Sequence, residues 1–209
     1  MEIRKPILDK KSLKKVVFDE TALTELDGVL VDGGALEIIH AAEIKITSSI
    51  LNAVSFQSLL VEEMSIIDSF LNAANFAGAT INRIYLERTV ISKSRLQGTQ
   101  FMNCLAREVL IEKSKCGESS FRYAKIKNTI FQDCDMENVD FLGAEMENIV
   151  FKNCSLKNSQ FSHSKLKNVS FKESEINGIA IDKDSFGEIT VNTGQAIYLA
   201  SRLGLHIED

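Results

Sequence analysis

Every fifth residue is apolar along most of this chain, and no insertion or deletion interrupts this register. Steps of five from Leu26 to Val191 give 34 positions, and every one of them is apolar. Apolar residues make up 44% of the sequence, so chance alone would fill about 15 of these positions. Ten of the twelve phenylalanines fall in this register, and only Phe18 and Phe70 do not. A period of five fits neither an α-helix nor a flat strand.

The residue two places before each apolar centre is restricted as well. It is usually small or of modest size, as in Ser94, Thr99 and Cys104, and it carries no charge from Thr24 to Ile179. Two inward positions in every five, one large and one small, describe a chain that turns a corner every five residues. The other three positions are mostly polar and are expected to face water. The pattern therefore predicts a solenoid with a continuous apolar interior.

Several five-residue segments share a pattern of a small residue, a polar residue, a large apolar residue and two variable ones. They include CDMEN, AEMEN and CSLKN, which begin at Cys134, Ala144 and Cys154. These segments resemble the pentapeptide-repeat family, and the resemblance covers roughly residues 24–191. It implies an all-β fold, a right-handed quadrilateral β-helix with ~20 residues per coil, about eight coils and a short C-terminal α-helical cap.

A coil of this length predicts which side chains stack on one another. Two columns of phenylalanine are expected on opposite walls of the interior, and columns of alternating charge are expected outside, where each ion pair contributes little. A column of asparagines falls at a corner, where an amide can bond to the backbone of the turn. The predicted columns are Phe131, Phe151 and Phe171; Phe101, Phe121, Phe141 and Phe161; Lys125, Glu145 and Lys165; Lys127, Glu147 and Lys167; and Asn128, Asn148 and Asn168.

The ends of the chain depart from the period of five. We expect an N-terminal cap over residues 1–25, the β-helix over 26–191, and a C-terminal helix and tail over 192–209. Asn192 or Thr193 can cap a helix that Gly204 can stop, and Leu205 and Ile207 then alternate as in a strand.

The C-terminal segment resembles the terminal cap of Qnr-like proteins, in which a helix forms a two-fold contact. The resemblance implies a homodimer through this region, and the simpler alternative is a lid on the last coil. The candidate cap and dimer residues are Ala196, Ile197, Tyr198, Ala200, Leu203, Leu205 and Ile207.

No motif indicates catalysis, a metal site or a cofactor. His40, His163 and His206 are scattered and adjoin no nucleophile, and no phosphate-binding or dinucleotide-binding glycine motif is present. The four cysteines form no C-x-x-C pair, and we expect them to be buried thiols, although Cys134 and Cys154 are close enough for a disulfide. We therefore predict that the protein is not an enzyme and holds no cofactor or metal.

Charge suggests how such a rod could bind a partner. The net charge is −5, which gives no support to direct nucleic-acid binding. Basic residues are concentrated between Arg83 and Lys127. No basic residue lies between Lys127 and Lys152, and the six acidic residues in this interval would wrap the rod as a belt. The candidate partner-binding belt is Asp133, Asp135, Glu137, Asp140, Glu145 and Glu147. The belt is either an imitation of DNA phosphates or an ordinary solvated surface. The columns of alternating Lys and Glu favour the solvated surface.

The resemblance extends to Qnr- and MfpA-type proteins, which bind DNA gyrase or topoisomerase IV. It implies a DNA-mimicking protein that modulates a type II topoisomerase or protects it from fluoroquinolones. The alternative is a non-enzymatic scaffold with another protein partner. A continuous acidic stripe along a wall would favour the first function, and a patchwork of charges the second. The sequence shows no signal peptide and no apolar stretch long enough to cross a membrane, so we expect a cytoplasmic protein with no membrane partner.

Overall fold

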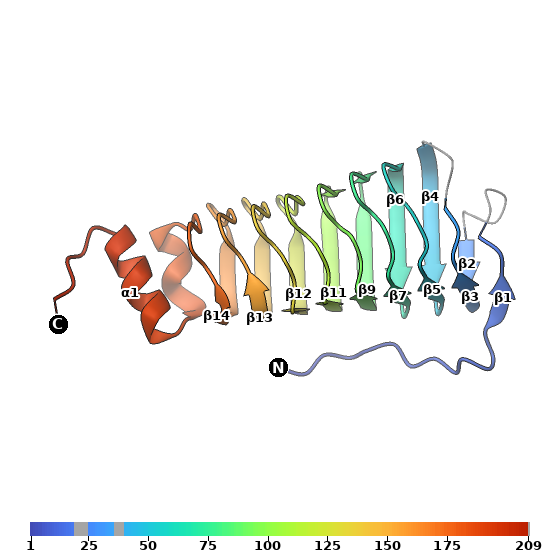
Figure 1. Cartoon of the computed structure of the whole chain (residues 1–209), viewed down its shortest axis with the longest axis horizontal. Helices are drawn as coiled ribbons and strands as arrows, with labels where there is room; N and C mark the ends of the chain where they lie inside the picture. Colours follow the sequence, from blue (N-terminus) through green and yellow to red (C-terminus); the bar gives the residue numbers. More distant parts are fainter. Residues whose placement is uncertain (19–24, 36–39, 209) are drawn as a thin grey trace.

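The computed structural model describes residues 1–18, 25–35 and 40–208, and these form a rod of stacked coils (Figure 1). Its strands join into one 15-stranded sheet. Successive coils pair in parallel: Leu105 pairs with Lys125, and Ile126 pairs with Met146. Stacked side chains such as Asn128 and Asn148 are 20 residues apart. The predicted all-β solenoid of about eight coils with a C-terminal helix is therefore confirmed.

The strands fall into two sets by length. The long strands turn a corner between two walls of the coil, and the short ones lie on single walls. The long strands are β4 (His40–Thr47), β6 (Leu60–Ile67), β9 (Ile84–Ser92), β11 (Cys104–Glu112), β12 (Lys125–Gln132), β13 (Glu145–Ser155) and β14 (Lys165–Glu175). The short strands are β1 (Lys14–Val16), β2 (Glu25–Asp27), β3 (Val29–Asp32), β5 (Ile50–Asn52), β7 (Phe70–Asn72), β8 (Thr80–Ile81), β10 (Gln100–Phe101) and β15 (Ile189–Thr190). A 3₁₀-helix, η1 (Lys183–Glu188), and one α-helix, α1 (Thr193–Arg202), follow the last full coil.

The interior is built from the two inward positions of each pentapeptide. Every centre from Ile46 to Ile176 is buried, and so is every residue two places before a centre from Ile44 to Val169. The two phenylalanine columns stack as the sequence predicts, with ring centroids 5.1 Å apart for Phe131 and Phe151. Rings of opposite columns meet edge to face across the interior. This arrangement combines offset stacking with T-shaped contacts and fills a narrow core.

Small polar side chains inside the coil bond to the backbone of the coil before. The hydroxyl of Thr89 donates to the carbonyl of Ile66, and that of Ser159 donates to the carbonyl of Met136. The thiols of Cys134 and Cys154 take the same position and approach the carbonyls of Ile111 and Phe131. Buried polar atoms at this position of the pentapeptide are therefore paired, as a dry interior requires.

The corners hold the backbone in the left-handed region. Asn128, Asn148 and Asn168 have φ of 49°, 55° and 52°, which asparagine tolerates better than most residues. The sequence predicts that their amides bond to the turn backbone, but they bond to one another. Asn148 donates to Asn128 at 2.9 Å, and Asn168 donates to Asn148 at 2.8 Å. Stacking at this spacing brings each amide within hydrogen-bonding distance of the amide one coil away.

Each end of the rod has its own closure. At the N-terminal end, β1 pairs with β3, and the ring of Phe18 packs edge to face on Phe56 at 5.7 Å. At the C-terminal end, Asn192 caps α1 in a reciprocal capping box with Gln195. Residues 205–208 form no strand, so the alternation of Leu205 and Ile207 does not produce the predicted extension.

Candidate binding surfaces

The six acids of the predicted belt wrap around the rod. Asp135 stacks between Lys115 and Ser155, and Asp140 stacks between Ser120 and Gln160, so the two lie in different columns. Glu145 and Glu147 belong to β13, on a further wall. The belt therefore does not align its carboxylates along one wall.

Basic residues on neighbouring coils pair with most of these acids. Asp140 lies 3.2 Å from Arg122, and Glu137 lies 3.6 Å from Lys157. Asp133 accepts a hydrogen bond of 2.7 Å from the amide of Asn153, which lowers its pKa. Within the described part of the chain, the side chain of Asp135 accepts one hydrogen bond, from the backbone amide of Glu137 at 3.3 Å.

Glu145 and Glu147 sit in the columns of alternating charge that the sequence predicts. Glu145 lies 2.9 Å from Lys165, and Glu147 lies 2.7 Å from Lys127 and 3.2 Å from Lys167. Hydrogen bonds from these lysines lower the pKa of both carboxyl groups. The glutamates are thus locally neutralised, although exposure to water keeps each pair weak.

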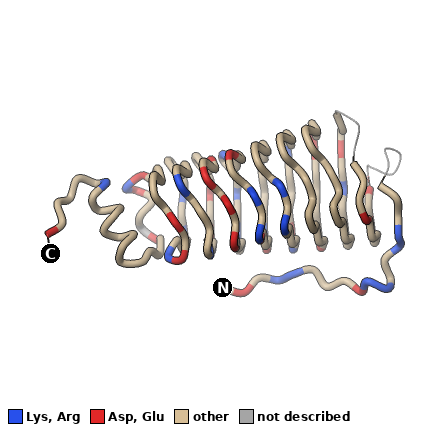
Figure 2. The backbone as a smooth tube through the Cα atoms, viewed as in Figure 1, with Lys and Arg blue, Asp and Glu red and all other residues tan. Residues whose placement is uncertain are grey.

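The charges of the rod form a patchwork. One column changes sign along the axis, from Arg95 and Lys115 to Asp135 and, after Ser155, to Glu175. Figure 2 shows acidic and basic residues mixed along the described coils. The charges in this column therefore form a patchwork and not a continuous acidic stripe.

The C-terminal helix closes the last coil through Leu199 and Gln195, which sequence reasoning did not select, and through Tyr198, which it did. Leu199 is buried in the main core, and the amide of Gln195 donates to the carbonyls of Phe171 at 2.8 Å and Ser174 at 2.6 Å. Tyr198 is half-buried, and its hydroxyl accepts a hydrogen bond from the amide of Gly178. The capping box at Asn192 fixes where the helix begins, and Gln195 and Leu199 are its buried residues.

The opposite face of the C-terminal segment points to solvent. Ile197, Leu203, Leu205 and Ile207 are each about half exposed, at 49, 52, 60 and 48%. Ala196 is exposed and Ala200 is half-buried. The predicted cap and dimer residues therefore divide into a capping residue, Tyr198, and an apolar group available for contact with another molecule.

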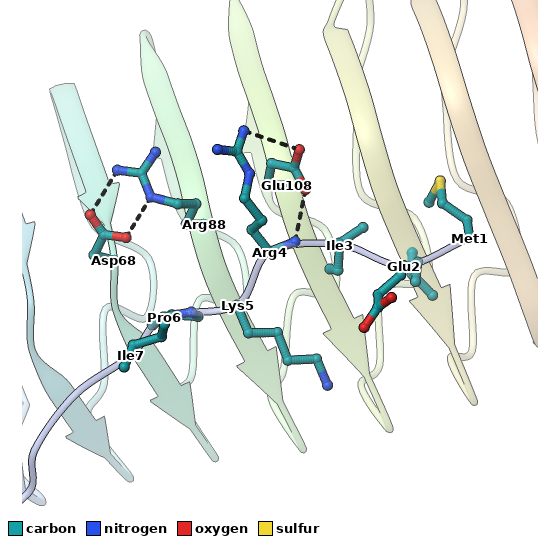
Figure 3. Close-up of a pocket in the computed structure, with 11 residues that line it drawn as sticks. Met1, Glu2, Ile3, Arg4, Lys5, Pro6, Ile7, Asp68, Arg88 and Glu108 are labelled. Carbon is teal, nitrogen blue, oxygen red and sulfur yellow. Dashed lines mark hydrogen bonds and ion pairs between the residues drawn. The ribbon is translucent and has the colours of Figure 1, made fainter.

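A second surface, which sequence reasoning missed, lies outside the core on the wall of β7, β9, β11 and β12. We define the N-terminal arm as residues 1–8. It runs back along the rod and crosses these strands (Figures 1 and 3). Ile3 is buried against Val90 and Leu110, and Phe70 and Ile130 pack around them. This cluster is separate from the main core.

A buried carboxylate fixes the arm at the same place. Glu108 is 7% exposed, and it accepts a hydrogen bond of 2.9 Å from the backbone amide of Arg4. The guanidinium of Arg4 lies 3.5 Å from the same carboxylate. Burial raises the pKa of Glu108, but the hydrogen bonds from Arg4 and Asn128 outweigh burial and leave the pKa below its ordinary value.

The repeat matches known families of sequences. Residues 71–105 match the family described as pentapeptide repeats (8 copies), and residues 112–181 match the family described as a pentapeptide repeat region. The two matches together span half of the chain. The chain belongs to the pentapeptide-repeat family. Pentapeptide-repeat proteins are right-handed β-helices, which completes the predicted fold class.

Comparison with solved structures finds other pentapeptide-repeat proteins. A trypsin-treated form of QnrB1, a plasmid-mediated fluoroquinolone resistance protein, superposes with a TM-score of 0.52 at 13% identity, over 94% of this chain and 100% of that chain. HetL, a protein involved in heterocyst differentiation regulation in the cyanobacterium Nostoc, gives a TM-score of 0.46 at 10% identity, over 84% of each chain. The match to QnrB1 establishes the likeness of fold. No curated protein sequence matches the chain.

Reactive side chains of this pentapeptide-repeat protein are dispersed. All four cysteines are free and buried, and burial raises the pKa of the Cys104 thiol to about 12. His40 lies 3.4 Å from Glu62, and His163 lies 3.3 Å from Asp182. Across residues 1–18, 25–35 and 40–208, no group of three His, Cys, Asp or Glu side chains is arranged to hold a metal ion. In the same ranges, no helix is long and apolar enough to cross a membrane.

Proposed function

We propose that this protein is a non-enzymatic binding rod that acts in the cytoplasm on a type II topoisomerase, either DNA gyrase or topoisomerase IV. The observation that carries this proposal is the likeness of fold to the fluoroquinolone resistance protein QnrB1, which extends over 94% of this chain. The resemblance of the sequence to Qnr- and MfpA-type proteins points to the same partner. Binding would inhibit the enzyme or protect it from fluoroquinolones.

The rigidity of the surface supports a binding role. Stacked phenyl rings fix the interior, and hydrogen bonds between side chains one coil apart fix the exterior, as between Asn148 and Asn168. Side chains held in this way lose little entropy when a partner binds. A rod of this kind presents its charges in a fixed pattern.

The pattern of charge favours contact with a mixed-charge protein surface rather than imitation of DNA. A phosphate mimic needs carboxylates that are free to meet the basic residues of its partner. Glu137, Asp140, Glu145 and Glu147 instead lie within 4 Å of a basic side chain of this chain. We therefore expect Asp133 and Asp135, which have no such pair among the described residues, to contribute most to binding through the belt.

A scaffold with a different protein partner is the second candidate function. The observation that favours it is the patchwork of charge, in which Arg95, Lys115 and Asp135 follow one another in a single column. Such a surface suits many protein partners and does not require a DNA-binding one.

We also propose that the protein is a homodimer through its C-terminal segment. Ile197, Leu203, Leu205 and Ile207 leave apolar side chains in water, and contact with a second copy would bury them. A two-fold axis beside α1 would place the same apolar face of each copy against the other.

Direct binding to the topoisomerases tests the proposal. The purified full chain is immobilised, and DNA gyrase and topoisomerase IV are passed over it by biolayer interferometry. We expect saturable binding that weakens at least fivefold in the double variant Asp133→Asn, Asp135→Asn. The matched control is Glu173→Gln, Glu175→Gln, which removes two charges from the same columns further along the rod and is expected to bind as the wild type does.

Two outcomes would contradict parts of the proposal. Absence of binding to either enzyme at micromolar concentrations would exclude a type II topoisomerase as the partner and leave the scaffold function. Equal losses of affinity in the belt variant and in its control would show that binding depends on net charge, and would exclude the belt as the contact surface.

A further inference from the structure

The wall beneath the N-terminal arm carries a line of apolar side chains that the fold itself does not need. We call it the outer ridge. It consists of the residue just before the centre in seven successive coils of this wall: Leu30, Ile50, Phe70, Val90, Leu110, Ile130 and Val150. These residues lie on the outside of the coil, and polar side chains are expected there. The corresponding positions on a neighbouring wall are polar, as Asn75, Arg95 and Lys115 illustrate.

The N-terminal arm covers the middle of this ridge through few anchors. Ile3 and Pro6 are the two buried residues of the arm, and they are three positions apart. Ile7 is 97% exposed, and the side chain of Arg4 is 65% exposed. A spacing of three places side chains on one face of an extended, proline-compatible segment. The arm thus resembles a short peptide bound to a surface more than a part of the core.

The surface under the arm has the chemistry of a receptor for such a peptide. Val90 and Leu110 form an apolar seat for the aliphatic side chain. Glu108, beside it, is a buried acceptor for the next backbone amide and its cationic side chain. Figure 3 shows the arm crossing the strands, with Arg4 directed toward Glu108. The groove between the arm and this wall has a volume of about 1170 Å³, so the arm does not seal it.

We propose that the outer ridge is a peptide-docking surface. The N-terminal arm occupies it as an internal ligand, and an extended segment of a partner protein with the order aliphatic–Arg–x–Pro replaces the arm there. The order of residues is that of the arm itself, Ile3-Arg4-Lys5-Pro6. The ridge continues past the arm to Val150, which gives a longer partner segment further apolar contact.

The arm acts as a competitor because it is tied to the surface that it covers. A tethered segment faces its site at an effective concentration of the order of millimolar, so a free peptide of the same sequence meets strong competition. Replacement of Ile3 by Asp would place a charge against Val90 and near Glu108, and it would release the arm. The released protein would then bind the free peptide more tightly.

The test uses the full chain and a fluorescein-labelled peptide with the sequence of residues 1–8, read by fluorescence anisotropy. We expect the Ile3→Asp protein to bind this peptide at least tenfold more tightly than the wild-type protein. A peptide that carries the same Ile3→Asp change should not bind. The double variant Ile3→Asp, Leu110→Asp has a released arm and a damaged seat, and it should also not bind.

Circular dichroism and thermal melting of each variant establish that the rod remains folded, because both substitutions lie outside the main core. Equal affinity of the peptide for the wild-type and Ile3→Asp proteins would overturn the proposal, as would unchanged binding in the double variant. Size-exclusion chromatography adds one more outcome. If the wild type is a dimer and Ile3→Asp converts it into a monomer, the arm of a second copy occupies the ridge. That result would also overturn the proposal.

Discussion

At the scale of single residues, the interior depends on side chains that each contact several coils. Phe141 is fully buried, stacks on Phe121 at 5.2 Å and on Phe161 at 4.9 Å, and meets Phe131 and Phe151 edge to face. Removal of one ring therefore leaves a cavity that a stacked, close-packed column cannot collapse to fill.

We predict that Phe141→Ala destabilises the rod by about 3–5 kcal/mol, through lost burial and an unfilled cavity. Phe186→Ala is the matched control, because Phe186 is only half-buried beyond the last full coil, and it should cost clearly less. Urea denaturation followed by circular dichroism measures both. Equal costs would mean that the stacked column adds nothing to stability beyond the single ring.

The buried thiols give a prediction about pH. The ordinary pKa of a cysteine is 9.0, and desolvation raises that of Cys104 to about 12. Below pH 9 the thiol is protonated in both states, and its contribution to stability is fully present. As the pH rises from 9 toward 12 only the unfolded chain ionises, so this contribution is lost by about 1.4 kcal/mol per pH unit.

Thermal melting between pH 8 and 11 checks this, with Cys104→Ala as the comparison that removes the background of lysine and tyrosine titration. The wild type should lose stability faster than the variant above pH 9. Parallel curves would show that the thiol ionises as easily in the folded rod as in the unfolded chain.

The period of five predicts which residues point inward because one rule decides burial at every centre. It leaves out Phe70, since the period describes the inside of each coil and Phe70 points outward. Comparison of coils would have found the outer ridge, because the residue before the centre is apolar in every fourth pentapeptide from Leu30 to Val150. The partner of that ridge, the arm, carries no periodic signal.

At the scale of elements, the two ends of the rod decide whether the exposed sheet edge is protected. The helix α1 covers the last coil through Leu199, with Gln195 bonded to the carbonyls of β14 that no further coil can satisfy. The sequence predicts the helix and offers Asn192 or Thr193 as its cap, because both are local signals, and the structure uses Asn192. It does not predict which face turns inward, since apolar residues occur on both faces of this helix.

The two faces of α1 should separate stability from self-association. We predict that Leu199→Ala costs about 2–4 kcal/mol and speeds hydrogen exchange in β14, because the lid no longer fills the end of the core. Ile197→Ser should leave the melting temperature nearly unchanged and convert a dimer into a monomer in analytical ultracentrifugation.

An Ile197→Ser protein that sediments as the wild type does would contradict the C-terminal dimer. A Leu199→Ala protein with normal stability and normal exchange in β14 would contradict the assignment of α1 as a lid.

At the scale of the whole molecule, the rod is a stiff carrier of a mixed charge pattern. Columns of alternating sign, such as Lys125, Glu145 and Lys165, follow directly from the sequence once the coil length is known. The local neutralisation of Glu145 and Glu147 also follows from these columns. The identity of the partner does not follow from the sequence, because it depends on complementarity to a surface that lies outside this chain.

Supercoiling of relaxed plasmid by DNA gyrase, titrated with the purified wild-type protein in the presence and absence of ciprofloxacin, tests the central claim most directly. The account predicts either restored supercoiling under the drug or inhibition without it. It also predicts a weaker effect of the Asp133→Asn, Asp135→Asn protein and an unchanged effect of the Glu173→Gln, Glu175→Gln protein. No effect of the wild type on gyrase, or on topoisomerase IV in the matching decatenation assay, at protein in large excess over enzyme would contradict it.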